Sequence, residues 1–134
     1  MTTHTHEVLV VEDDATLRDA ICEALREEGI SCTRCEDGQD ALDLLRAGAR
    51  PCLVLLDLQM PFVDGMNLRR QQLEDPVLAD IPVVIVTGHP RKEKEAMRLG
   101  ISVYLKKPIP PSRLVEVVEH NCAHAPRPRS ASVG

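Results

Sequence analysis

The sequence predicts a doubly wound α/β fold in which a five-stranded parallel sheet carries helices on both of its faces. Short apolar runs alternate with amphipathic stretches five times along the chain, and this order favours a parallel sheet. The apolar runs are continuous, which is typical of strands that are covered on both sides. The chain has 134 residues, a length that favours one domain.

The five expected strands differ in strength. Three of them are rich in valine, isoleucine and leucine: Val8–Val11, Cys52–Leu56 and Pro82–Val86. Ile30–Cys35 and Ser102–Leu105 are weaker, and we expect them at the edges of the sheet. Right-handed crossovers leave few topologies, and one of these is the flavodoxin-like strand order 2-1-3-4-5.

Helix start and stop signals lie between the strands. Asp37 is expected to cap the second helix and Asp64 the third. The fourth helix is expected over Arg91–Leu99, and Gly100 ends it. Pro111 is expected to start the fifth helix.

Composition excludes some classes of protein. The net charge is −5 and the only aromatic residues are one Phe and one Tyr, which argues against nucleic-acid binding through phosphates or base stacking. No apolar run approaches the ~18 residues of a membrane span. Residues 1–6 are expected to be flexible and show no signal peptide, so we expect a cytoplasmic protein that does not bind membranes. Residues 7–121 are expected to form the domain and residues 122–134 a disordered tail.

The five cysteines are expected mostly to be small core side chains in a reducing compartment. Cys32 and Cys35 form a Cys-x-x-Cys pair, but residues three apart in a strand point to opposite faces, which argues against a metal or redox site. His120 and His124 have the i, i+4 spacing of metal ligands. They lie where the last helix is expected to fray, so a chance spacing is the preferred interpretation.

Polar residues follow four of the expected strands. Acids follow the first and third strands, a hydroxyl the fourth and a lysine the fifth: Glu12, Asp13, Asp57, Thr87 and Lys107. The carboxyl ends of parallel strands meet at one edge, so in the order 2-1-3-4-5 Asp57 is expected between the acids and Thr87. Strands lie ~4.8 Å apart, so the fifth strand is about 10 Å from the third, a gap that a lysine side chain can partly bridge.

Three clustered acids predict a cation. Two carboxylates ~5 Å apart repel by about 3 kcal/mol at an effective dielectric constant of ~20. Hard oxygen ligands favour Mg²⁺. A carboxylate beside Mg²⁺ can attack a phosphoryl group to give an acyl phosphate, while the metal and Lys107 neutralise the equatorial oxygens. The Thr87 hydroxyl can then donate a hydrogen bond to one of these oxygens.

Four segments, VLVVEDD, LVLLDLQMPFVDG, VVIVTG and YLKKPI, resemble the receiver domain of bacterial response regulators over about residues 7–121. The resemblance implies that Asp57 is the phosphoacceptor. It implies that Asp13 binds Mg²⁺ directly, that Glu12 acts through water, and that the backbone carbonyl of Gln59 is a further ligand.

The resemblance also implies a switch. Thr87 would be its hydroxyl, Lys107 the lysine that pairs with the phosphate, and Tyr104 the aromatic whose rotamer follows Thr87. Simple packing of Tyr104 stays open as an alternative. Strand alternation points Lys106 and Lys107 to opposite faces. Lys107 is chosen because it directly precedes Pro108, and this peptide bond is typically cis in the family.

Two further positions are of interest for the lifetime of the phosphorylated state. Gln59 lies two residues beyond Asp57, and His89 lies two residues beyond Thr87. In the family these positions border the path of the water that hydrolyses the acyl phosphate. We therefore hypothesise that both side chains tune the rate of dephosphorylation.

The implied function is that of a signalling domain rather than an enzyme, apart from its own Mg²⁺-dependent phosphorylation and slow dephosphorylation. A histidine kinase or phosphotransfer protein would phosphorylate Asp57. The surface of the fourth helix, fifth strand and fifth helix would then switch toward a downstream protein target or a homodimer. The domain would act alone or as part of a longer chain.

Three alternatives stay open. A receiver-like domain could dock partners without phosphorylation. An aspartate-nucleophile phosphatase also forms an aspartyl phosphate, but it needs a second acid where Gln59 stands. A flavodoxin-like flavin protein needs hydroxyls and backbone donors for its phosphate, whereas the loop after the first strand is acidic.

Overall fold

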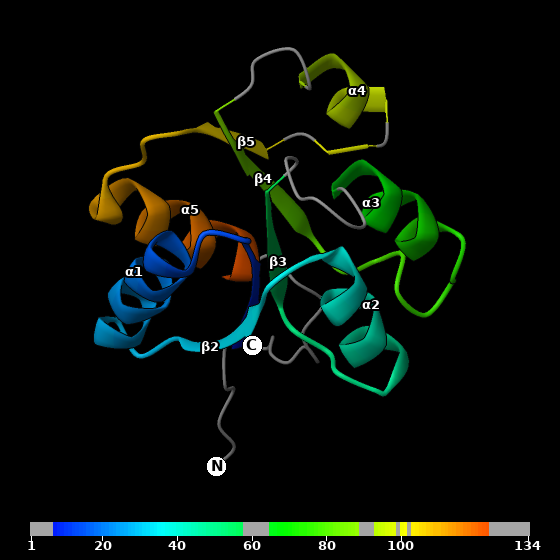
Figure 1. The fold of residues 1–134 in the computed structure, drawn as a ribbon, viewed down its shortest axis with the longest axis horizontal. Coiled ribbons are helices and arrows are strands. Elements are labelled where there is room, and N and C mark those ends of the chain that lie inside the picture. Colours follow the sequence, from blue (N-terminus) through cyan, green and yellow to red (C-terminus); the bar gives the residue numbers. More distant parts are fainter. Residues whose placement is uncertain (1–6, 58–64, 89–92, 99, 102, 124–134) are drawn as a thin grey trace, which may run out of the picture.

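The computed structural model describes residues 7–57, 65–88, 93–98, 100–101 and 103–123. Within these residues, five strands and five helices alternate along the chain (Figure 1), as the sequence predicts. In chain order they are β1 (Glu7–Val11), α1 (Ala15–Glu27), β2 (Ser31–Cys35), α2 (Gly38–Arg46), β3 (Leu53–Asp57), α3 (Gly65–Leu73), β4 (Val83–Thr87), α4 (Glu93–Arg98), β5 (Val103–Lys106) and α5 (Pro111–Ala123).

The strands form one parallel sheet in the order β2-β1-β3-β4-β5. This confirms the predicted topology, and the two less apolar strands, β2 and β5, lie at the edges. The central strand β3 is buried along its whole length, as its unbroken apolar sequence predicts. Val11 pairs with Leu56 and Asp57 with Val86, so the ends of β1, β3 and β4 lie side by side.

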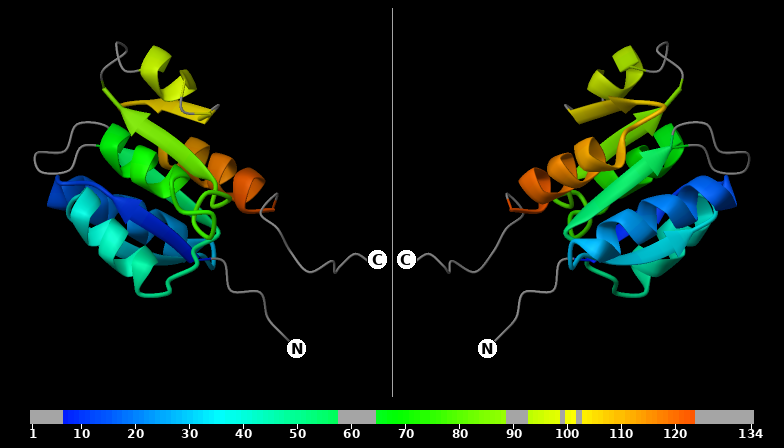
Figure 2. Two further views of the ribbon diagram at one scale, coloured as in Figure 1. Left: turned by 90° about the vertical axis from the view of Figure 1, so that its right-hand side faces the viewer. Right: turned by 90° about the vertical axis from the view of Figure 1, so that its left-hand side faces the viewer.

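The helices cover both faces of the sheet (Figures 1 and 2), with α1 and α5 on one face and α2 and α3 on the other. Successive residues of β1 alternate between two buried clusters. Val8 and Val10 pack with residues of α1 and α5, whereas Leu9 and Val11 pack with residues of α2 and α3. The molecule therefore has two apolar layers, one on each side of the sheet.

The helix ends agree with the sequence signals where the structure describes them. Asp37 caps α2, because its Oδ1 accepts a hydrogen bond of 2.9 Å from the N–H of Asp40. Gly100 has a φ of +79°, a conformation that favours glycine after a helix. The proposed cap Asp64 and the expected helix end Leu99 lie outside the described residues.

A buried polar network fixes the turn between α3 and β4. The Nε2 atom of Gln72 donates hydrogen bonds to the carbonyl oxygens of Leu78 (2.8 Å) and Ile81 (2.9 Å). Its Oε1 accepts a hydrogen bond of 2.9 Å from Nη1 of Arg69. Burial lowers the pKa of the Arg69 guanidinium below its usual value. The network gives the carbonyl oxygens of Leu78 and Ile81 a side-chain donor, in addition to the hydrogen bond of 3.1 Å that the Leu78 oxygen accepts from the N–H of Ile81.

Two of the five cysteines differ from the expectation that cysteines in this chain are small core side chains. Cys22, Cys32 and Cys35 are free, as expected for most of the five, but Cys52 and Cys122 form a disulfide. Helix α5 runs back along the sheet from the end of β5, so its last turn meets the start of β3. Cys122 also lies in α5, which continues to Ala123, although a tail was expected from residue 122.

Within the described residues, no helix has the length and apolar character needed to cross a membrane.

Candidate functional site

Three carboxylates converge at the carboxyl edge of the sheet. Glu12 and Asp13 directly follow β1, and Asp57 is the last residue of the neighbouring strand β3. One ligand oxygen from each side chain lies within 4.8 Å of the others. The sequence predicts this convergence, because parallel strands that are neighbours place their carboxyl ends together.

Two of the three carboxylates are buried. Glu12 is 2 % exposed and Asp57 is 3 % exposed, whereas Asp13 is exposed to solvent. Burial raises the pKa of Glu12 to about 7; the charge of Asp57 adds to this, and Lys107 offsets part of it. The cluster is thus open to solvent on the side of Asp13 and closed on the side of Glu12.

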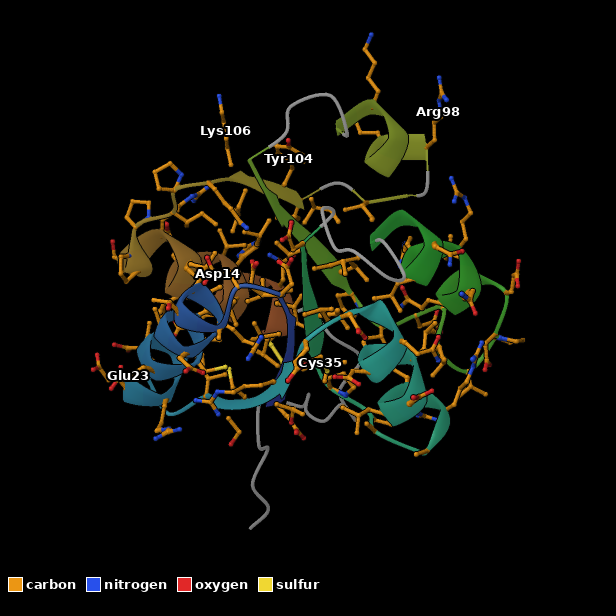
Figure 3. All side chains as sticks on the ribbon, viewed as in Figure 1. Asp14, Glu23, Cys35, Arg98, Tyr104 and Lys106 are labelled. Carbon is orange, nitrogen blue, oxygen red and sulfur yellow. A yellow bond between two sulfur atoms is a disulfide. The ribbon has the colours of Figure 1, made fainter. Side chains whose placement is uncertain are left out.

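Lys107 is the cation that faces the two buried acids. Its Nζ atom lies 3.0 Å from Oε1 of Glu12 and 3.3 Å from Oδ2 of Asp57. Partial burial works against its charge, but the hydrogen bond to Glu12 and the charges of Asp57 and Glu12 raise the pKa of Lys107 above its usual value. Lys106 is exposed and points away from the molecule (Figure 3), as strand alternation predicts.

The donor set fits a divalent cation of the Mg²⁺ type. All three side chains offer hard oxygen ligands, and one of them is open to solvent. When all are ionised, three carboxylates and the ammonium of Lys107 leave a charge of −3 + 1 = −2. One divalent cation would neutralise this charge.

The backbone of Glu12 is fixed by groups around it. Its carbonyl oxygen accepts a hydrogen bond of 2.8 Å from Nη1 of Arg18, and its N–H donates to the carbonyl oxygen of Cys35 over 3.1 Å. Its Oε2 accepts from the N–H of Asp14 over 3.2 Å. The role of Arg18 is not predicted from the sequence, because an arginine near the start of a helix carries no signal that distinguishes it from a surface residue.

The other residues expected at the site lie on β4 and β5 or outside the described residues. Thr87 is the last residue of β4, the strand next to β3, and pairs in register with Lys106. Tyr104 lies in β5, is partly buried and packs against the apolar layer on the α2–α3 side. Gln59 and His89 lie outside the described residues. The peptide bond between Lys107 and Pro108 is cis.

A family profile described as a response regulator receiver domain matches residues 8–119. The chain belongs to this family. Receiver domains are signalling domains of two-component systems, and phosphorylation on an aspartate is their general function. They interact with histidine kinases and with downstream effectors.

Individual proteins also resemble the chain over most of its length. A 14.6 kDa protein encoded in the sodA1 3′ region of Leptolyngbya boryana is 34 % identical over 122 residues, which are 90 % of this chain and 92 % of that protein. The polar-differentiation response regulator DivK of Brucella anthropi is 32 % identical over 114 residues, which are 84 % of this chain and 92 % of DivK. Two transcriptional regulators of Pseudomonas aeruginosa also match, but the chain spans only 24 % and 48 % of their lengths.

A solved receiver structure shares the fold. The signal receiver domain of a signal transduction histidine kinase from Syntrophus aciditrophicus has a TM-score of 0.84 and 28 % identity. The match covers 97 % of this chain and 99 % of that chain. It extends the similarity from sequence motifs to the arrangement of the whole receiver fold.

Proposed function

We propose that this receiver domain accepts a phosphoryl group on Asp57, with Mg²⁺ held by Asp57, Asp13 and, indirectly, Glu12. One observation carries the proposal: the carboxylate of Asp57 lies both in the three-acid cluster and 3.3 Å from Nζ of Lys107. A phosphoryl group on that carboxylate would thus be next to an ammonium and a divalent-cation site. This is the charge arrangement that phosphoryl transfer requires.

The chemistry proceeds from the carboxylate of Asp57. One of its oxygens attacks the phosphorus of a phosphohistidine in the donor, the P–N bond breaks, and the imidazole leaves and takes up a proton. The product is an acyl phosphate on Asp57. Bound Mg²⁺ would neutralise charge on the transferred oxygens. The Lys107 ammonium neutralises charge from the side of β5, because its Nζ already lies against Asp57.

The three acids have different proposed roles because their surroundings differ. Both carboxylate oxygens of Glu12 already have protein partners, one the ammonium of Lys107 and the other the N–H of Asp14. This supports an indirect role for Glu12, through water. Asp13 is exposed and is the proposed direct ligand. The backbone carbonyl of Gln59 is proposed as a further ligand. Gln59 lies outside the described residues.

Phosphorylation is proposed to shift an equilibrium between two conformations of the surface formed by α4, β5 and α5. Thr87 would donate to a phosphoryl oxygen, and Tyr104 would follow it inward. Tyr104 lies in β5, between α4 and α5 in the chain order, so its movement would alter the surface of α4, β5 and α5. That surface is the proposed docking site for a downstream protein or a second copy of the chain.

The donor in this proposal is a histidine kinase or a histidine phosphotransfer protein, and nucleic acid is not a direct partner. The cytoplasmic location inferred from the sequence stays a prediction. The domain would catalyse only its own phosphorylation and slow dephosphorylation. Gln59 and His89 remain candidates for tuning the rate of dephosphorylation.

The test is labelling by a small phosphodonor with Mg²⁺, followed by intact-mass measurement. The parent chain should gain one phosphoryl group, and Asp57→Asn should gain none. Lys106→Ala is the matched control and should label like the parent, because the Lys106 side chain is exposed and points away from the molecule. Labelling of Asp57→Asn at the parent rate would overturn the assignment. No labelling of a folded parent chain would favour docking without phosphorylation.

A further inference from the structure

Helix α5 connects the two ends of the sheet. It begins at Pro111, just after Lys107 at the carboxyl edge, and runs back to the amino edge, where its last turn carries Cys122. The sulfur of Cys122 is bonded to that of Cys52, with 5.3 Å between the Cα atoms. Cys52 directly precedes β3, so the bond joins the end of α5 to the strand that carries Asp57.

The two bonded cysteines differ in solvent exposure. Cys122 is 2 % exposed and packs in the apolar layer between the sheet and helices α1 and α5. Cys52 is partly exposed at the edge of the same layer. Of the two residues, Cys52 is therefore the more accessible to a small thiolate in solution, and Cys122 is the more protected.

We propose that the Cys52–Cys122 bond is a site of reversible exchange with low-molecular-weight thiols of the glutathione class. A thiolate attacks Sγ of Cys52, a new sulfur–sulfur bond forms, and Cys122 leaves as a thiolate that takes a proton from water. A second thiolate attacks the mixed disulfide and releases Cys52 as a thiolate. The two small thiols are oxidised to one small disulfide, and the protein disulfide is reduced to two thiols. The reverse reaction closes the bond.

The fold accommodates both states. The layer that holds Cys122 also holds the free cysteines Cys22, which is fully buried, and Cys32. Free cysteines are thus compatible with its packing. Helix α5 is also anchored by Leu114, Val117 and Val118, which are all buried. Reduction therefore loosens the last turn of α5 and leaves the domain folded.

The setting favours exchange over a permanent structural bond. In a reducing compartment, disulfides are mostly transient, catalytic or redox-sensing. This step rests on the proposed function, because the compartment follows from cytoplasmic signalling. The bond closes a loop between residues 70 apart in sequence. Opening it therefore increases the conformational entropy of the unfolded chain and lowers the stability of the fold.

The exchange site and the phosphoacceptor lie at opposite ends of β3. The five residues of this strand separate them by about 17 Å along the sheet, at roughly 3.3 Å per residue. Exchange at Cys52 should therefore leave the chemistry of Asp57 unchanged. It should act on α5, which belongs to the proposed partner surface.

The test equilibrates the full chain in buffers with stepped ratios of glutathione to glutathione disulfide, then alkylates free thiols and identifies them by mass spectrometry. Cys52 and Cys122 should change state together over the series, and Cys22 should not. Any trapped adduct with glutathione should be at Cys52 rather than Cys122. The oxidised chain should melt on the order of 10 °C above the reduced chain, as expected for a long closed loop.

Four variants make the test specific. Cys52→Ser should melt at one temperature in all buffers, whereas the matched control Cys35→Ala should keep the redox-dependent shift. Cys122→Ala replaces Cys52→Ser if the latter does not fold. Asp57→Asn should also keep the shift, so a failure of the proposed phosphorylation leaves this test intact. Thiols at Cys52 and Cys122 in every buffer, or a bond that never opens in folded protein, would overturn the proposal.

Discussion

The ammonium of Lys107 lies 3.0 Å from the carboxylate of Glu12, and the two groups come from opposite ends of the described chain. The same ammonium lies 3.3 Å from Asp57, so one cation serves two acids that are almost fully buried. Before any metal binds, this lysine supplies a positive charge to both buried acids.

Replacing this lysine should destabilise the metal-free domain. Lys107→Met leaves Glu12 and Asp57 without their shared cation, so they must either repel each other or bind protons. We expect a loss of about 1–3 kcal/mol in the free energy of unfolding. The loss is smaller than for a fully buried pair, because the Lys107 side chain is 24 % exposed. Urea denaturation at neutral pH with a chelator measures it.

The neighbouring lysine provides the control for this measurement. Lys106 is exposed and points away from the molecule, so Lys106→Met should change the free energy of unfolding by no more than about 0.5 kcal/mol. Equal urea midpoints for the two variants would show that Lys107 does not compensate the buried acids.

The adjacent acids Asp13 and Asp14 are expected to have different roles. Asp13 is expected to bind the metal, whereas Asp14 caps helix α1. The proposed ligand Asp13 is exposed, while Oδ1 of Asp14 accepts a hydrogen bond of 3.1 Å from the N–H of Leu17 and caps α1. Asp13→Asn should weaken the stabilisation that Mg²⁺ gives to the folded state, because a ligand that binds only the folded protein raises its stability. Asp14→Ala should cost about 1 kcal/mol and keep the Mg²⁺ response.

Melting temperatures over a MgCl₂ titration distinguish the two acids. Each point is paired with NaCl at the same ionic strength, which removes the general effect of salt on surface charges. If both variants responded to Mg²⁺ as strongly as the parent chain does, Asp13 would not be a ligand.

The parts of the site that could be predicted follow from the geometry of parallel strands. The apolar runs before Glu12 and Asp57 are unbroken, so these acids had to lie at strand ends, and the strand order then made them neighbours. Strand alternation likewise separated Lys106 from Lys107. These inferences needed only a period of two and the direction of the chain.

Other features depend on packing that the sequence pattern does not encode. Cys52 and Cys122 are 70 residues apart, and their pairing requires the direction and length of α5. Gln72 reads as a surface residue of a polar helix, yet it is 2 % exposed. Its burial depends on how the turn before β4 folds back over α3, which no local periodicity predicts.

This buried glutamine should be important for stability. Gln72→Ala removes both hydrogen bonds to the carbonyl oxygens of Leu78 and Ile81 and leaves these groups without that donor. We expect a loss of about 2–4 kcal/mol in the free energy of unfolding. Gln71→Ala is the matched control: Oε1 of Gln71 accepts an exposed hydrogen bond from Arg46, so its loss should cost less than about 1 kcal/mol. Similar urea midpoints for the two variants would contradict a structural role of the network.

Two glycines should differ in their tolerance of a methyl group. Gly100 has a φ of +79°, and a Cβ added there would lie 3.6 Å from Nη2 of Arg69. The space is sufficient, so the cost of Gly100→Ala is the backbone conformation alone, about 1–2 kcal/mol. Gly88 has no positive φ, and an added Cβ would meet nothing within 4 Å. Gly88→Ala should therefore leave the free energy of unfolding unchanged or slightly raised, because alanine restricts the unfolded chain. A larger loss from Gly88→Ala than from Gly100→Ala in urea denaturation would show that the turn after α4 does not need the left-handed conformation.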